Sequence, residues 1–209
     1  MNFNKIMVID DLLPKNYANH IEKTVFSQAY EWTFLDNINA TKKLTQQSEV
    51  LPEHNEGFYN SSFEQKANAP IQNENFHTFK IIYYTALYKL NVDIEPVVKR
   101  CRSFLLLPNS LKTQEWDIPH VDGHNPHYVF LYYVNDSDGP TCIFNNNSVQ
   151  SKSNMVVPQK IQPKKNRLLI FNGNMYHAST PPKLGKRAVI NFNFEIFDWP
   201  LNMNKEYVI

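Results

Sequence analysis

The stretch Arg187-Ala188-Val189-Ile190-Asn191-Phe192-Asn193-Phe194 decides the fold, because apolar and polar side chains alternate along it. Successive side chains of a β-strand point to opposite faces of the sheet. The even-numbered residues therefore form one apolar face, and the other face carries Arg187, Val189, Asn191 and Asn193. This alternation predicts a strand with one face against a hydrophobic core and a more polar face on the other side.

Short segments upstream of this stretch are also predicted to be strands, because they are rich in β-branched or aromatic residues and are separated by Pro, Gly and Asn. The predicted strands of the second half span residues 97–107, 128–135, 141–144, 154–157, 167–171 and 188–196. The first half differs. A short strand is predicted over residues 5–9, and apolar residues at helical spacing predict helices that include residues 17–25 and 76–90.

Helices followed by a run of strands indicate an α+β fold that is mainly β, with helices backing a β-sandwich or jelly roll. A chain of 209 residues with 42% hydrophobic residues suits one domain, residues 1–209. Residues 1–96 would supply helical support and a polar loop or lid, and residues 97–198 the β core. The polar segment 37–75 is too long for an ordinary connection, so we expect a functional loop or lid that also contains short strands.

Net charge points to no class of charged partner, because 21 Lys and Arg residues balance 20 Asp and Glu residues. We therefore expect neither a membrane nor a nucleic acid as partner. The basic group of Lys99, Arg100 and Arg102 is interpreted as a solvated sheet edge. Cys101 and Cys142 match neither a disulfide framework nor a zinc ribbon, so reduced thiols are expected. The first residues lack the apolar stretch of a signal peptide, so we expect a cytoplasmic protein.

The motif with chemical meaning is Pro119-His120-Val121-Asp122-Gly123. On an extended segment, residues two apart point the same way, so His120 and Asp122 would present an imidazole and a carboxylate to one point. His177 follows an apolar strand and can supply a third ligand. Two histidines and one carboxylate on one face of an octahedron leave three positions open, as in non-haem iron oxygenases. A zinc hydrolase and a purely structural role are the alternatives.

Arg187 follows His177 in the sequence and begins the alternating strand. An arginine on a row that faces a cavity is costly unless an anionic group meets it. Its planar guanidinium group suits a carboxylate, which it binds through two hydrogen bonds. The alternative is a solvent-exposed arginine at the start of a strand.

Over residues 97–196 the chain resembles the prolyl 4-hydroxylase-like branch of the 2-oxoglutarate/Fe(II) dioxygenases. The resemblance rests on the order and spacing of Pro119-His120-Val121-Asp122, Leu131-Tyr132-Tyr133-Val134-Asn135, Gly139-Pro140-Thr141, Pro163-Lys164-Lys165-Asn166-Arg167-Leu168-Leu169-Ile170-Phe171, His177-Ala178-Ser179 and Gly185-Lys186-Arg187. It implies a double-stranded β-helix backed by N-terminal helices, with a metal between its two sheets. Pro140 and Asn166 stand where the family often has glycine, and Leu107 where it often has tyrosine.

The resemblance also implies a catalytic set. Fe(II) would be held by His120, Asp122 and His177, and the co-substrate 2-oxoglutarate would be bound by Arg187, by the hydroxyl of Tyr133, and beside Leu131 and Asn191. Dioxygen would then drive oxidative decarboxylation of 2-oxoglutarate to succinate and carbon dioxide, coupled to hydroxylation of a substrate C–H bond. Ascorbate is a candidate reductant.

The expected substrate is a prolyl residue in a peptide or protein, with a free amino acid, another small metabolite or a nucleobase as alternatives. A non-catalytic jelly-roll binding module is the rival from a different class. Substrate contacts are expected from residues 37–75, from Trp116 and from the loop at residues 112–118, because lids and rims set specificity on such scaffolds.

The other histidines do not fit the metal motif. His124 and His127 follow it, but Gly123, Asn125 and Pro126 indicate a loop there, so we interpret both histidines as rim residues near the substrate. The remaining three are predicted to be structural or exposed: His20, His54 and His77.

Overall fold

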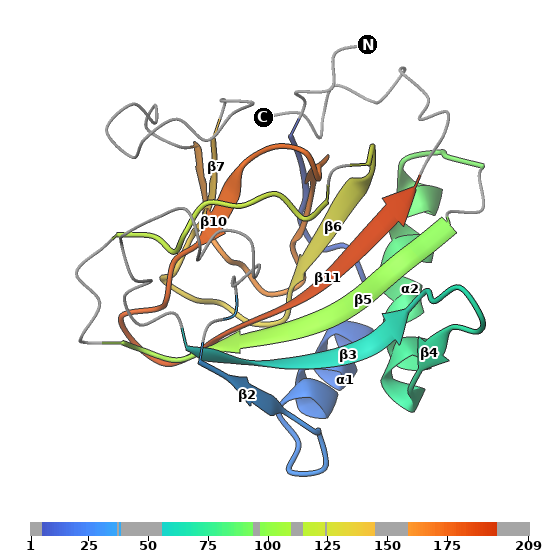
Figure 1. The fold of residues 1–209 in the computed structure, drawn as a ribbon. Helices are drawn as coiled ribbons and strands as arrows, with labels where there is room; N and C mark the ends of the chain where they lie inside the picture. Colours follow the sequence, from blue (N-terminus) through green and yellow to red (C-terminus); the bar gives the residue numbers. More distant parts are fainter. Residues whose placement is uncertain are drawn as a thin grey trace.

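The structure, a computed structural model, describes residues 6–36, 38, 56–93, 97–109, 115–123, 125–144 and 159–195. In these residues the helices are α1 (Lys15–Val25) and α2 (Glu74–Lys89), and neither is both long and apolar enough to cross a membrane. The strands are β1 (Met7–Ile9), β2 (Thr33–Leu35), β3 (Gly57–Glu64), β4 (Ile71–Gln72), β5 (Val97–Leu106), β6 (Tyr128–Tyr133), β7 (Thr141–Ile143), β8 (Gln159–Ile161), β9 (Leu168–Asn172), β10 (His177–Ser179) and β11 (Arg187–Glu195). Figure 1 shows them coloured along the chain.

Two antiparallel sheets make up the β part of the fold. Within the described residues, eight strands form the large sheet, in the order β1-β9-β6-β11-β5-β3-β2 with β4 beside β3. Three strands form the small sheet, in the order β10-β7-β8. The last strand, β11, lies between β6 and β5 (Figure 1), so neighbours in the sheet come from distant parts of the sequence. The fold is therefore mainly β with jelly-roll architecture, which confirms the predicted fold class.

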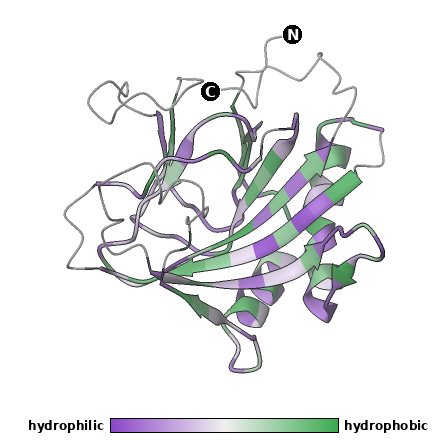
Figure 2. Ribbon diagram, in the orientation of Figure 1, coloured by the Kyte–Doolittle hydropathy of each residue, from purple (hydrophilic) through white to green (hydrophobic). Residues whose placement is uncertain are grey.

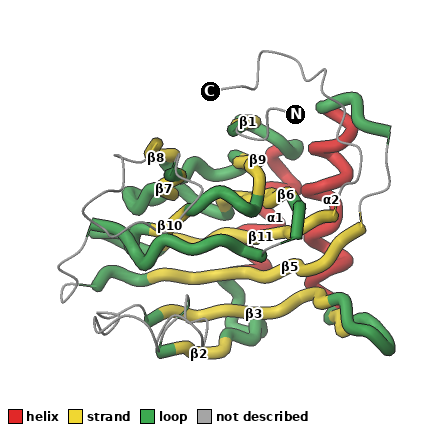
Figure 3. Tube along the Cα trace, turned by 45° about the horizontal axis from the view of Figure 1, so that its top comes forward, coloured by secondary structure: helices red, strands yellow, loops and turns green. Residues whose placement is uncertain are grey.

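Helices α1 and α2 cover one face of the large sheet (Figures 1 and 3). The core on this side buries the even-numbered residues of β11, from Ala188 to Phe194. Tyr83 of α2 meets Phe192 and Phe194 edge to face, with ring centroids 5.6 and 5.3 Å apart. Aromatic pairs favour this geometry. The alternation along β11 thus places its apolar face against α2.

The opposite face of the large sheet packs against the small sheet. Val129 and Leu131 of β6 and Val189 of β11 share a buried cluster with Ile143 of β7 and Ile161 of β8. Figure 2 shows hydrophilic and hydrophobic residues alternating along β5 and β11, which gives these strands two different faces. The polar residues that face away from the helices therefore lie on the side of the small sheet.

The predicted elements agree with the observed ones wherever the structure describes them. The predicted helix at 76–90 is α2, and the strands predicted at 97–107, 128–135, 141–144, 167–171 and 188–196 are β5, β6, β7, β9 and β11. The polar segment 37–75 contains β3 and β4, in line with the short strands expected there. The strand predicted at 154–157 lies outside the described residues, and β8 and β10 were not predicted.

Asn166 lies in the turn before β9, and its side chain forms hydrogen bonds to the N-terminal segment. Its backbone φ is +67°, in the left-handed region that few residues other than glycine adopt and that asparagine tolerates. Its side-chain oxygen accepts hydrogen bonds from Leu13 N–H at 2.9 Å and from the Tyr132 hydroxyl at 3.2 Å, and its amide donates to the Leu13 carbonyl at 2.8 Å. Asparagine therefore keeps the turn and adds three hydrogen bonds that glycine could not make.

Candidate metal centre

His120, Asp122 and His177 come together on the side of the large sheet that faces the small sheet. One ligand atom from each residue lies within 4.8 Å of the others, and no other such group of three occurs in the described part of the chain. His120 and His177 form an isolated antiparallel bridge, in which each backbone N–H donates to the carbonyl of the other at 2.9 Å. The Asp122 N–H donates to the Gly173 carbonyl at 3.2 Å. Backbone pairing thus closes the long sequence gap between the two motifs.

A hydrogen bond at Nδ1 orients each histidine. His120 Nδ1 lies 3.2 Å from the Ile118 carbonyl oxygen, and His177 Nδ1 lies 2.9 Å from the Met175 carbonyl oxygen. Because a carbonyl only accepts, Nδ1 carries the proton, and Nε2 of the neutral ring keeps its lone pair. The Nε2 atoms of His120 and His177 lie 3.8 and 3.6 Å from Oδ1 of Asp122. This is the tautomer that leaves Nε2 available as a metal ligand.

Two amides of β11 hold the Asp122 carboxylate. Its Oδ2 atom accepts hydrogen bonds from Asn191 at 3.1 Å and from Asn193 at 2.7 Å. Arg100 braces this arrangement, because its Nε donates to Asn193 Oδ1 at 3.1 Å and its Nη2 donates to the Asp122 backbone carbonyl at 2.6 Å. Because Oδ2 accepts these two hydrogen bonds, Oδ1 is the carboxylate oxygen that faces the two histidines. Asn191, predicted beside the co-substrate, lines the cavity but donates to the candidate metal ligand.

Burial and neighbouring charges set the protonation states of these groups. Burial disfavours the charged form of His120 and, together with repulsion from His177, lowers its pKa to about 4. Burial acts to raise the pKa of Asp122, but the two nearby histidines and the hydrogen bond from Asn193 hold it well below its usual range. Burial opposes charge on His177 as well, yet the nearby Asp122 carboxylate raises its pKa. An anionic carboxylate beside two imidazoles fits a divalent transition metal.

The candidate ligands line a cavity of about 210 Å³ that also reaches Arg187. Arg187 is only 3% exposed. Its Nε donates to the Gly139 carbonyl at 2.9 Å, and its Nη2 donates to Thr141 Oγ1 at 2.8 Å. Burial lowers its pKa, and no carboxylate in the described residues pairs with it. Because a buried cation without a counterion is costly, the cavity suits an anion beside Arg187.

Thr141 stands between Arg187 and Tyr133, a role that the sequence did not reveal. The Tyr133 hydroxyl donates to Thr141 Oγ1 at 2.7 Å, and Thr141 lines the cavity. Its oxygen accepts from both neighbours, so its own proton is free to donate to a bound group. Leu131 also lines the cavity, as predicted. The segment Gly139-Pro140-Thr141 was recognised in the sequence, but only the paired strands reveal that Thr141 contacts Arg187.

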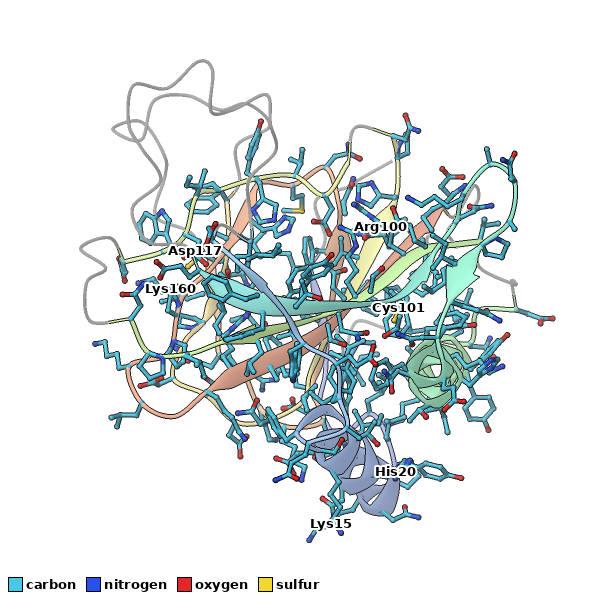
Figure 4. All side chains as sticks on the ribbon, turned by 60° about the horizontal axis from the view of Figure 1, so that its bottom comes forward. Lys15, His20, Arg100, Cys101, Asp117 and Lys160 are labelled. Carbon is cyan, nitrogen blue, oxygen red and sulfur yellow. The ribbon has the colours of Figure 1, made fainter. Side chains whose placement is uncertain are left out.

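The interpretation of Arg100 and Arg102 as a solvated sheet edge was wrong, because both line the cavity. They alternate along β5 with the buried residues Cys101 and Ser103, which face the other way. Figure 4 places Arg100 on the side of the large sheet away from α1, which carries His20. The alternation of apolar and basic residues along β5 could have predicted that the two arginines share a face, but a run of basic residues is more often a solvated surface.

The predictions for Trp116 and for the remaining histidines have different outcomes. The rim interpretation of His127 was wrong: it is buried, its Nδ1 lies 2.7 Å from the Asn125 carbonyl oxygen, and its ring packs so closely on Gly173 that a Cβ there would lie 1.9 Å from Nε2. Trp116 packs on Phe144 with ring centroids 5.7 Å apart and, within the described residues, does not line the cavity. His20 and His77 are exposed, and His54 and His124 lie outside the described residues.

Solved structures of several other proteins share this fold. A prolyl hydroxylase from Trichoplax adhaerens, in complex with a hypoxia inducible factor oxygen degradation domain peptide fragment, matches at a TM-score of 0.60 and 16% identity, over 92% of this chain and 84% of that chain. A Pseudomonas putida prolyl-4-hydroxylase matches at 0.53 and 12%, over 92% of each chain. The non-heme α-ketoglutarate-dependent epimerase SnoN from nogalamycin biosynthesis matches at 0.59 and 8%, over 93% and 78%.

No protein-family model and no curated protein matches the sequence. At such low identities, likeness to solved structures establishes the fold, and the reaction has to be argued from the residues that the fold brings together. The chain has the jelly-roll fold of the prolyl hydroxylases and of other 2-oxoglutarate-dependent oxygenases.

Proposed function

We propose that this chain is a 2-oxoglutarate- and Fe(II)-dependent oxygenase that hydroxylates a C–H bond. The observation that carries the proposal is that Arg187, buried without a carboxylate partner in the described residues, lines the same cavity as the candidate metal ligands. A dicarboxylic keto acid needs both features, because a metal chelates its keto-acid end and a guanidinium group binds its far carboxylate. The fold shared with 2-oxoglutarate-dependent oxygenases supports this reading.

The residues that would hold the metal and 2-oxoglutarate each have a defined task in this proposal. His120, Asp122 and His177 would hold the metal through Nε2, Oδ1 and Nε2, while the amides of β11 keep the carboxylate in place. Arg187 and the hydroxyl of Thr141 would bind and orient the far carboxylate of 2-oxoglutarate. The apolar lining by Leu131, Phe171 and Val189 would limit access of water to the site.

Iron suits this site better than zinc does. Three protein ligands leave three of six octahedral positions, which is enough for a chelating keto acid and for dioxygen. Zinc sites are normally tetrahedral and leave a single position open. When bound, iron supplies the redox chemistry: one oxygen atom of O₂ enters succinate, the other enters the substrate as hydroxyl, and carbon dioxide leaves.

For the substrate we propose a prolyl residue in a peptide or protein. Support comes from the two prolyl hydroxylases that share the fold, one of them solved with a peptide. SnoN shares the fold too and is an epimerase of nogalamycin biosynthesis, so a small molecule is the alternative. Ascorbate as reductant and a cytoplasmic location belong to the same proposal.

Product analysis tests the reaction. The protein is incubated in air with Fe(II), 2-oxoglutarate and a library of proline-containing peptides, and succinate and peptide mass are measured. We expect succinate to form and a prolyl peptide to gain one oxygen atom. His177→Ala, which removes a ligand, should form neither product. Succinate formation by the parent no faster than by His177→Ala would contradict the proposed reaction. Succinate without any hydroxylated prolyl peptide would redirect the search to small molecules.

A further inference from the structure

Two arginines of β5 also line the cavity, and one of them, Arg102, has no role in the proposed reaction. From Arg100 onward, every second residue of β5 lines the cavity: Arg100, Arg102, Phe104 and Leu106. Arg102 pairs in register with Asn191 of β11. Residues paired across antiparallel strands carry side chains on the same face, with Cβ atoms about 5 Å apart. The side chain of Arg102 therefore begins next to Asn191, whose amide donates to the Asp122 carboxylate.

The two arginines differ in how their donors are used. Arg100 donates to Asn193 and to the Asp122 backbone carbonyl, so it supports the metal centre. Arg102 has a buried Nε atom without a hydrogen-bond partner. Its ion partner in the described residues is Glu64, at 3.5 Å from Nη2, and the same Glu64 oxygen lies 2.8 Å from Lys66 Nζ. Because the Glu64 charge is shared, Arg102 keeps donors that neither the metal centre nor the proposed 2-oxoglutarate site uses.

The charge of the cavity also favours an additional anion. Among the described lining residues, one carboxylate meets three guanidinium groups: Asp122 against Arg100, Arg102 and Arg187. Iron(II) and the dianion of 2-oxoglutarate cancel each other, so binding both leaves the cavity positive. Arg187 and Asn191 are four residues apart on β11, or about 13 Å along the strand. Arg102 thus flanks the metal centre, away from the Arg187 end.

We propose that Arg102 binds an anionic oxygen group, a carboxylate or a phosphate, on the substrate that is hydroxylated. This inference rests on the proposed function and narrows its substrate class. Guanidinium groups bind both anions through paired hydrogen bonds, and Nε is one of the donors that such pairing uses. A substrate anchored in this way would present its C–H bond near the metal, on the side of Arg102.

The test compares matched probes with and without the anionic group. N-acetyl-L-proline is paired with N-acetyl-L-prolinamide for the carboxylate, and thymidine 5′-monophosphate with thymidine for the phosphate. Each is titrated without oxygen into the protein loaded with Fe(II) and 2-oxoglutarate. Binding is followed by the change in the visible charge-transfer band that a keto acid chelated to ferrous iron gives. We expect one anionic probe to bind about tenfold or more tightly than its neutral partner, since hydrogen bonds to a charged group contribute this much.

Two variants locate the effect. Arg102→Met should abolish the preference for the anionic probe while leaving the affinity for 2-oxoglutarate unchanged. Lys99→Met should keep the preference, because Lys99 is a cation of the same strand that pairs with Glu195 and does not line the cavity in the described residues. The anionic probe that shows the preference identifies the group as carboxylate or phosphate.

Several results would overturn the inference. Equal binding of both members of each pair, or no binding of either, would do so, as would a preference that survives in Arg102→Met. Weaker binding of 2-oxoglutarate by Arg102→Met would place Arg102 in the co-substrate site instead. Absence of any absorption band in the parent protein would reject the proposed function itself, and this inference with it.

Discussion

Asp122 depends on its neighbours more than any other candidate ligand, because two amides of β11 fix its carboxylate. Removing the Asn193 amide leaves all three ligands present, but Oδ2 then keeps only the longer hydrogen bond from Asn191, and Arg100 Nε loses its acceptor. Groups that orient metal ligands typically contribute a factor of about 10–100 to metal affinity.

We therefore expect Asn193→Ala to weaken Fe(II) binding by about 10- to 100-fold. Anaerobic titration with Fe(II), or with Co(II) as a spectroscopic substitute, measures the affinity. Asn19→Ala is the matched control, since it removes an amide from α1 that contacts Lys165 far from the cavity. An unchanged affinity in Asn193→Ala would mean that the amide does not position Asp122.

Thr141 and Tyr133 should make separable contributions to the proposed co-substrate site. Thr141 lines the cavity and has a proton to donate, whereas the Tyr133 hydroxyl reaches Thr141. Thr141→Val should therefore raise the 2-oxoglutarate concentration needed for half-saturation by about tenfold, and Tyr133→Phe by clearly less. Saturation curves of the visible band measure both values. The reverse order would show that Tyr133 donates directly to 2-oxoglutarate, as the family resemblance implies.

At the scale of elements, the turn before β9 ties the N-terminal segment to the large sheet through Asn166. Asn166→Gly keeps the left-handed turn but leaves the buried Leu13 backbone groups without their side-chain partner. We expect it to lower the free energy of unfolding by about 2–4 kcal/mol. Urea denaturation measures the change.

Asn91→Gly provides the control for this variant. Asn91 also has a positive φ, of 54°, just beyond the end of α2. The same substitution at a left-handed position should change the stability by less than about 1 kcal/mol. Equal losses in Asn91→Gly and Asn166→Gly would show that backbone flexibility, and not the Asn166 hydrogen bonds, explains the effect.

The elements differ in how far the sequence could predict them. Helix α2 was predictable because its buried residues repeat at helical spacing, and β11 because its faces alternate. Strand β3 was hidden in a polar segment, since its buried Asn60 and Ser62 are hydrogen-bonded to each other and carry no hydrophobic signature. Strand β10 has three residues and exists because it pairs with β7, which no local pattern reports.

At the scale of the whole molecule, the cavity lies on the face of the large sheet opposite the helices. The histidines and Asp122 were predictable because their motif is local and ordered along the chain. The amides that hold Asp122, the contact of Thr141 with Arg187 and the orientation of Arg102 depend on pairing between distant strands. Only the sheet register brings these residues together, so the sequence alone could not assign them.

Because strands of both sheets line the cavity, its ligands should stabilise the entire fold. Binding of a ligand at about 100 times its dissociation constant adds about 2.7 kcal/mol to stability. For a chain of this size we expect Fe(II) with 2-oxoglutarate to raise Tm by about 5–10 °C without oxygen. Differential scanning calorimetry measures the shift. His177→Ala should show little shift, and a shift equal to that of the parent would place the ligands elsewhere.

The absorption of the anaerobic complex tests directly whether the cavity binds Fe(II) and 2-oxoglutarate together. Fe(II) and 2-oxoglutarate are added without oxygen to the parent protein, to His177→Ala and to Arg187→Met. We expect the visible charge-transfer band of a keto acid chelated to ferrous iron in the parent. We expect no band in His177→Ala and a need for about 100-fold more 2-oxoglutarate in Arg187→Met. No band in the parent, or a band that persists in His177→Ala, would contradict this binding.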